Sequence, residues 1–99
     1  MVQRDTKVSL GYKKIESLVV PQSLDAPKIK RGRDERVCSL AVITAEGGAV
    51  RWRDDGVAPT PTDGMPLQAG STLVYDGNLA KIQFIGQLPL AKLNVTFYE

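Results

Sequence analysis

Apolar and polar residues alternate along several short segments of this chain, and a period of two is the pattern of a β-strand with one buried face. The clearest segment is residues 92–98, in which Leu93, Val95 and Phe97 occupy every second position. Helical periodicity, with apolar residues three and four positions apart, is hard to find anywhere in the sequence. The pattern therefore predicts an all-β protein whose last strand is residues 92–98.

Further strands follow from the same alternation and from short apolar runs. Residues 37–44 are apolar at almost every position, which predicts a central strand covered on both faces. Residues 45–48 contain two glycines and predict a hairpin turn that leads directly into the next strand. The other predicted strands are residues 7–10, 15–20, 50–53, 71–75 and 80–86. The predicted core is Leu40, Val42, Trp52, Leu73, Ile82, Phe84, Leu93, Val95 and Phe97.

Turn signals separate these strands about every 8 to 12 residues, which is the spacing expected of a β-sandwich or barrel. The chain has 99 residues, enough for one compact core but not for a core and a deep catalytic cleft. The sequence therefore predicts one small β-sandwich or jelly-roll-like barrel.

The stretch of residues 49–62 holds the only tryptophan. Val50 and Trp52 alternate with two arginines, which predicts a strand with one buried and one wet face. An Asp-Asp-Gly sequence then reverses the chain, because aspartate bonds its own backbone in turns and glycine supplies a positive φ. The prolines of residues 58–62 predict a stiff, extended link to the next sheet. The predicted structural anchors are Trp52, Asp54, Asp55, Gly56 and Pro59.

Charge is distributed unevenly along the chain. Residues 1–36 carry nine basic and five acidic residues, a net charge of +4, whereas residues 37–99 carry a net charge of −2. This asymmetry predicts an extended basic N-terminal arm with peripheral strands over residues 1–36 and a β-sandwich body over residues 37–99. Within the arm, residues 27–36 predict a solvated, charged connector. The residues predicted to touch an acidic protein surface or a neighbouring copy are Lys28, Lys30, Arg31, Arg33 and Arg36.

Catalytic and metal chemistry are not expected. The chain has no histidine, so the usual catalytic triads cannot be built, and its single cysteine leaves the common zinc-ligand sets incomplete. Cys38 lies within an apolar strand, which predicts a buried, inert thiol. Asp54 and Asp55 are favoured as turn residues over an acid–base pair or a calcium site, since successive strand-end side chains diverge. We therefore expect no enzyme, no cofactor and no metal.

The same reasoning limits the partners. The basic residues of the connector alternate with Asp34 and Glu35 and lack aromatic stacking partners, so nucleic acid is not expected. A small-molecule ligand is not expected either. The longest apolar runs are far shorter than the roughly 20 residues needed to cross a bilayer. The polar N-terminus predicts no signal peptide, and hence a protein kept in a cytoplasm or in an assembly built there.

Five segments together resemble a group of small structural proteins of tailed bacteriophages. These segments are residues 50–60 (VRWRDDGVAPT), 64–67 (GMPL), 69–70 (AG), 78–85 (NLAKIQFI) and 93–98 (LNVTFY). The resemblance covers about the last 60 residues and does not extend to the arm. The Arg-x-Asp-Gly-x-x-Pro-Thr order also resembles sandwich modules appended to glycoside hydrolases, in which this strand and turn are structural.

The resemblance implies a virion component, with capsid decoration or cement proteins as the closest function. Such a protein would be assembled in the host cytoplasm and would lie on the capsid surface. Its partners would be the major capsid protein and further copies of itself, as a trimer or dimer. Two alternatives stay open: a head-to-tail connector or tail component, and a carbohydrate-binding module on the particle that uses Trp52, Tyr75 and Tyr98.

Overall fold

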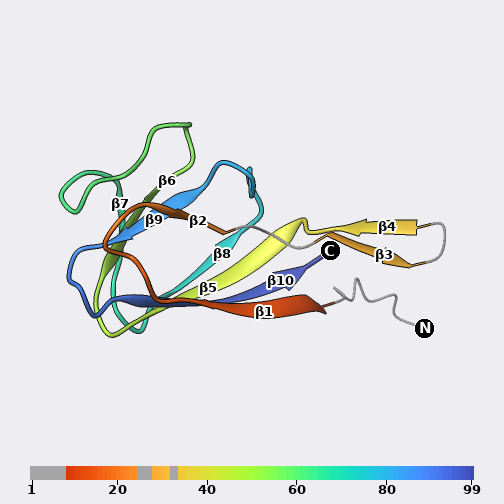
Figure 1. Cartoon of the computed structure of the whole chain (residues 1–99), viewed down its shortest axis with the longest axis horizontal. Helices are drawn as coiled ribbons and strands as arrows, with labels where there is room; N and C mark the ends of the chain where they lie inside the picture. Colours follow the sequence, from red (N-terminus) through yellow and green to blue (C-terminus); the bar gives the residue numbers. More distant parts are fainter. Residues whose placement is uncertain (1–8, 25–27, 32–33) are drawn as a thin grey trace, which may run out of the picture.

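The computed structural model describes residues 9–24, 28–31 and 34–99, and for residues 28–31 and 34–37 it describes the backbone alone. This part of the chain folds into β-strands joined by turns and contains no helix, so the all-β prediction is confirmed (Figure 1). The strands are β1 (Ser9–Ile15), β2 (Gln22–Ser23), β3 (Lys28–Arg31), β4 (Asp34–Val37), β5 (Leu40–Glu46), β6 (Val50–Arg53), β7 (Met65–Leu67), β8 (Thr72–Tyr75), β9 (Gln83–Gly86) and β10 (Lys92–Tyr98).

Eight of these strands form two four-stranded antiparallel sheets. The first sheet has the order β1-β10-β5-β8 and the second the order β2-β9-β6-β7. The chain passes repeatedly from one sheet to the other, so strands that are neighbours in the sequence are seldom neighbours in space. The predicted last strand has the observed bounds of β10 and lies inside the first sheet.

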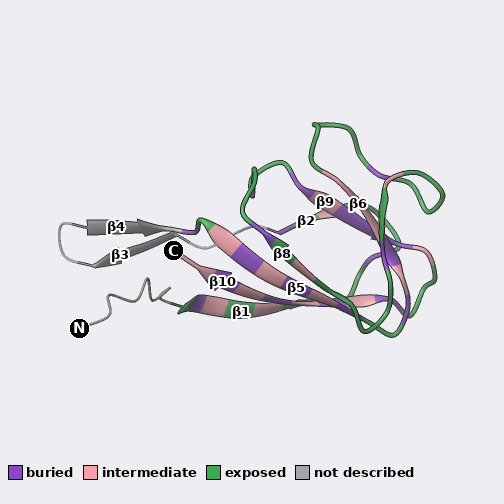
Figure 2. Ribbon diagram, turned by 180° about the vertical axis from the view of Figure 1, so that it is seen from behind, coloured by how far each residue is buried: buried purple, intermediate pink, exposed green. Residues whose placement is uncertain are grey.

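Apolar side chains from both sheets join in one buried cluster. Figure 2 shows the alternation of buried and half-exposed positions along β5 and β10 that this packing produces. Alternation places one face of each strand against the other sheet, as the period of two requires. The core prediction is confirmed for Ile82, Phe84, Leu93, Val95 and Phe97.

The prediction for β5 was right about its place and wrong about its faces. The strand is central, between β10 and β8. Ala41, Ile43 and Ala45 are buried, whereas Leu40 and Val42 are only partly buried, so the strand is covered on one face. An apolar run carries no alternation from which to choose the inward positions, and a shift of one residue exchanges the two faces.

Each of the first two strands is an edge strand, β1 of the first sheet and β2 of the second. A break was predicted at residues 11–14, but β1 runs through them and pairs with β10, with a register irregularity between Ser9 and Gly11. The strand predicted at residues 15–20 is wrong, because the chain turns there. The apolar side chains that residues 9–24 add to the core are Leu10, Ile15, Leu18 and Leu24. The division of the chain at residue 36 stays a prediction.

The charged connector is not a loop over its described residues. Strands β3 and β4 pair with each other as an antiparallel hairpin, in register from Lys28 with Val37 to Arg31 with Asp34. Of the predicted contact residues, four lie on these two strands and Arg33 lies outside the described residues. The four are Lys28, Lys30, Arg31 and Arg36.

The link between β5 and β6 crosses between the sheets. The hairpin predicted at residues 45–48 is wrong, since β5 pairs with β10 and β8 and β6 pairs with β7 and β9. Gly47 has a φ of 78°, and a Cβ at this position would lie 2.4 Å from the Leu90 carbonyl oxygen. Glycine is therefore needed for the conformation and for the close approach of the 87–91 turn.

Candidate functional site

The corner that follows Trp52 is a loop between two strands of the same sheet. The extended link predicted at residues 58–62 was expected to reach the other sheet, but β7 returns beside β6 and pairs Met65 with Trp52. The loop folds back on itself, because Thr60 and Asp63 exchange two backbone hydrogen bonds of 2.9 and 3.1 Å. Proline at position 61 suits such a tight turn, since its φ is already set.

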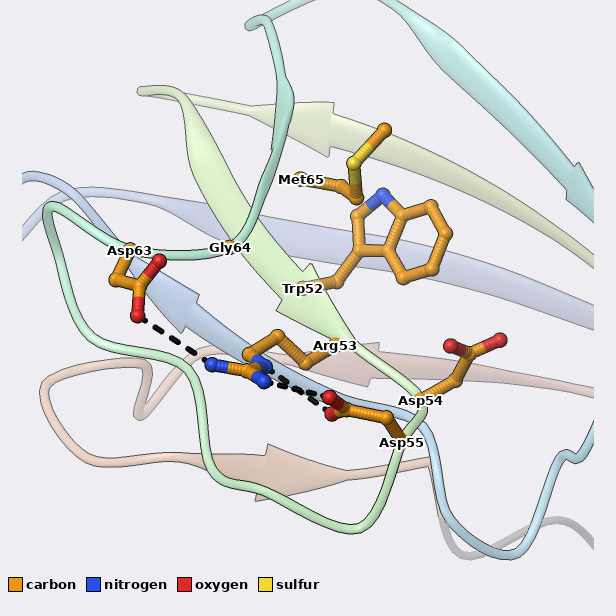
Figure 3. A pocket seen from close by; sticks show the side chains of 7 residues that line it. All are labelled: Trp52, Arg53, Asp54, Asp55, Asp63, Gly64 and Met65. Atoms are coloured by element: carbon orange, nitrogen blue, oxygen red, sulfur yellow. Dashed lines mark hydrogen bonds and ion pairs between the residues drawn. The ribbon is translucent and has the colours of Figure 1, made fainter.

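A hollow of about 390 Å³ lies at this corner (Figure 3). It is lined by Trp52, Arg53, Asp54, Asp55, Asp63, Gly64 and Met65. The indole of Trp52 is partly buried and packs against the core, and it meets the ring of Tyr75 from the other sheet edge to face, with centroids 5.9 Å apart. The hollow thus opens to solvent beside β7 and β8, which are edge strands of the two different sheets.

Arg53 joins two carboxylates across the mouth of the loop. Its Nε and Nη2 donate to the two oxygens of Asp55 at 3.1 and 2.5 Å, and its Nη1 donates to Asp63 Oδ2 at 3.3 Å. The hydrogen bond from Arg53 lowers the pKa of Asp55, and the same bond raises the pKa of Arg53. The bidentate contact with Asp55 fixes the guanidinium, and the bond to Asp63 joins the two ends of the loop.

Asp54 is hydrogen-bonded to a different partner. Its Oδ2 accepts a hydrogen bond of 2.7 Å from the hydroxyl of Tyr75, which is buried beneath the hollow. Burial of the phenol, followed by its bond to Asp54, raises the pKa of Tyr75 to about 12. Tyr75 is therefore a protonated donor at neutral pH, and it fixes the carboxylate of Asp54 beside the indole.

The predicted anchors all belong to this corner. The turn at residues 54–56 is present, with Gly56 at a φ of 86° and the Val57 amide donating to Asp55 Oδ1 at 3.4 Å. Pro59 is buried, and a Cβ added to Gly64 would lie 3.3 Å from its ring. Arg51 also braces the loop, since its Nη1 donates to the Gly64 carbonyl at 2.8 Å.

Sequence reasoning missed Asp63 and Met65, which line the hollow together with Trp52. The sequence feature that could have indicated them is their position on either side of Gly64, in a segment interpreted only as a turn. The three aromatic residues proposed for carbohydrate do not form one platform: Trp52 lines the hollow, Tyr75 is buried behind it, and Tyr98 lies on the face of the first sheet that points away from the core.

The residues that line the hollow are suited to binding a ligand. Three carboxylates stand against one guanidinium, which leaves a net charge of −2 beside an aromatic and a thioether surface. Among residues 9–24, 28–31 and 34–99, no group of three or more acidic or cysteine side chains is placed so that it could hold a metal ion. The described residues also contain no helix long and apolar enough to cross a membrane. Cys38 is buried, and its thiol donates to the Leu40 carbonyl at 3.3 Å.

A second surface is formed by the turns at residues 18–20 and 87–90. The amide of Gly86 donates to the Leu18 carbonyl at 2.8 Å, which brings the two turns together around a hollow of about 180 Å³. Neither turn contains a charged residue. The large exposed apolar side chains on them are Val19, Val20, Leu88 and Leu90, each more than half exposed.

Comparisons with protein-family models, with curated proteins and with solved structures found no match to this chain.

Proposed function

We propose that the chain is a virion structural protein that decorates a capsid and stabilises it by bridging capsid subunits. The observation that carries the proposal is the strand order. The eight strands of the two sheets follow the order of a jelly roll: the chain changes sheet at every step except from β6 to β7, and β3 and β4 are inserted between the second and third of the eight. Jelly rolls build viral capsid domains and lectins, so the architecture supports the resemblance of residues 50–98 to phage structural proteins. The fold alone does not carry function, and two surfaces add to the argument.

The uncharged turns at residues 18–20 and 87–90 support attachment to another protein. Scattered exposed apolar residues are ordinary, but a contiguous apolar patch on a small domain marks an interaction site. Here Val19 and Leu88 line one hollow, and Val20 and Leu90 are their neighbours in the chain. If this end of the molecule bound a capsid subunit, its apolar surface would be buried in the interface.

The basic hairpin supplies the second contact of the proposed bridge. Residues 28–36 contain five basic and two acidic residues, a net charge of +3. Charge at the rim of an interface steers the encounter of two proteins and fixes their orientation. In this proposal the hairpin contacts an acidic capsid surface or a neighbouring copy, and the protein lies on the virion surface after assembly in the host cytoplasm.

Particle binding tests the function. The variant Lys28→Glu/Lys30→Glu/Arg31→Glu reverses the charge of β3, and the matched control Lys81→Glu/Lys92→Glu alters two basic residues of the body. We expect the first variant to leave particles largely undecorated and the control to bind like the wild type. Deleting residues 1–36 is a poorer test, because Leu18 and Leu24 within that range are buried in the core.

Two alternatives are distinguished by simple readouts. A head-to-tail connector or tail component would form one ring at one vertex, whereas a decoration protein would cover the whole shell. Carbohydrate binding is favoured by one observation, the partly buried indole of Trp52 beside carboxylates in an open hollow. A glycan array probed with the whole chain tests this alternative, and glycan binding that is lost in Trp52→Ala would support it.

A further inference from the structure

We infer that the hollow at Trp52 receives a basic side chain from the β3–β4 hairpin of a second copy of this chain. The inference deepens the proposed function and rests on it for the idea that copies meet on the particle. It adds a receiving site to the basic hairpin and therefore a defined contact between copies. The site is built from the indole, the exposed thioether of Met65 and the carboxylate of Asp54.

The electrostatics of the hollow favour a cation. Arg53 bonds to both Asp55 and Asp63, so its charge is already engaged with these two carboxylates. Asp54 is not bonded to Arg53, and its partner is the uncharged hydroxyl of Tyr75. A neutral polyol can donate hydrogen bonds to these carboxylates but carries no net charge, whereas a lysine or arginine side chain is also attracted by the net charge of −2.

The shape and surface of the hollow fit the same ligand. The indole ring of Trp52, the carboxylate of Asp54 and the thioether of Met65 lie around one side of the hollow in Figure 3. A cation over an indole face is attracted by the ring quadrupole, and a nearby carboxylate adds a charge-assisted hydrogen bond. The methylene stem of a long basic side chain would pack against the sulfur of Met65.

Charge complementarity identifies the occupant. Residues 28–36 carry a net charge of +3 and residues 37–99 a net charge of −2, so each copy joins a basic segment of sequence to an acidic body whose hollow holds three carboxylates. In its own copy the hairpin extends away from β6 and β7 (Figure 1). Contact between unlike surfaces of successive copies is heterologous, and such contacts close into rings when the rotation between copies allows it.

Self-association and the fluorescence of Trp52 test the inference together. Trp52 is the only tryptophan, so its emission reports on the hollow directly. We expect sedimentation velocity of the whole chain at low salt to show a concentration-dependent oligomer, with a parallel change in Trp52 emission. Both changes should weaken at high salt, because the contact is between charges near the surface.

Charge exchange provides the decisive variants. Lys28→Glu/Lys30→Glu/Arg31→Glu alone and Asp54→Lys/Asp63→Lys alone should each weaken self-association by about tenfold or more, since like charges would then meet. Mixing the two variants should restore association. Asp54→Asn keeps the acceptor for Tyr75 and removes only the charge, so it should weaken association without loss of the fold. Asp76→Asn, an exposed acid outside the hollow, is the matched control and should have no effect.

Three results would overturn the inference: a wild-type chain that stays monomeric at every concentration, a mixture of the two charge variants that does not associate, or association with no change in Trp52 emission. A chain that binds glycan at the hollow and stays monomeric would overturn the inference in the same way as the first result. The proposed function is tested by a separate assay, the decoration of particles by Asp54→Asn. Normal decoration by a variant that no longer self-associates separates the two.

Discussion

The interior between the two sheets and the corner after Trp52 are stabilised by different physics. The interior is made of apolar side chains such as Phe84 and Phe97, which are almost completely buried and need no specific polar partner. The corner is held by a guanidinium between two carboxylates and by the Tyr75–Asp54 hydrogen bond, and much of it stays exposed. Burial specifies the fold, whereas the charged side chains of the corner stay accessible to solvent.

The largest effect expected from this comparison is the loss of a fully buried ring. Phe84 and Trp52 are directly opposite each other on β9 and β6, but Phe84 is completely buried and Trp52 is only partly so. We expect Phe84→Ala to lower the free energy of unfolding by about 3 to 5 kcal/mol, and Trp52→Ala to lower it by less. Urea denaturation of both variants measures this difference. An equal or larger loss in Trp52→Ala would place the corner inside the core and contradict the comparison.

A smaller effect is expected at two glycines with similar backbone conformations. Gly47 has a φ of 78° and a carbonyl oxygen in the way of any Cβ, whereas Gly56 has a φ of 86° and open space around it. Gly56→Ala should lower the stability by about 1 to 2 kcal/mol through backbone strain alone. Gly47→Ala should lower it further, because the 87–91 turn must move as well.

Thermal unfolding of the two alanine variants distinguishes strain from packing. If Gly47→Ala and Gly56→Ala unfold at the same temperature, the close approach of Gly47 to Leu90 does not constrain the fold. Gly70 has a φ of 84° and no atom near an added Cβ, so Gly70→Ala is a matched control for Gly56→Ala.

The last effect concerns pH. The pKa of Tyr75 is raised to about 12 in the folded chain, above the ordinary value near 10 that applies when the chain is unfolded. The folded state therefore keeps this proton longer, and the stabilisation is complete below pH 10 and is lost as pH rises from about 10 to 12. Tyr75→Phe removes the titrating group, so the wild type should lose stability more steeply than the variant across this range. If the stability of the wild type and of Tyr75→Phe fell equally with pH across this range, the raised pKa that burial and the bond to Asp54 give Tyr75 would be contradicted.

The sequence predicted most of the strands and little of their connection. Residues 92–98 alternate cleanly, and their bounds were predicted correctly because the pattern itself records which face is buried. The run at residues 37–44 lacks that record, so its inward positions were misassigned. The glycines at positions 47 and 48 indicated a turn but not whether the next strand would pair in the same sheet, since that choice depends on long-range packing.

The site was predictable only in part, because local patterns do not record long-range contacts. Trp52, Asp54, Asp55, Gly56 and Pro59 were identified as a corner from local turn chemistry, and they lie together. Tyr75 and Asp63 were not expected to meet them, because their contacts join residues 21 and 10 positions apart in the chain. Local patterns predict how the chain turns, whereas the partners of a side chain depend on which strands come to lie side by side.

Cryo-electron microscopy of assembled phage particles tests whether this chain decorates the capsid. We expect density for the chain at positions repeated over the whole capsid, with the uncharged turns at residues 18–20 and 87–90 against the shell and β3–β4 reaching an adjacent subunit. Density confined to a single vertex or to the tail, or particles that lack the chain altogether, would contradict it.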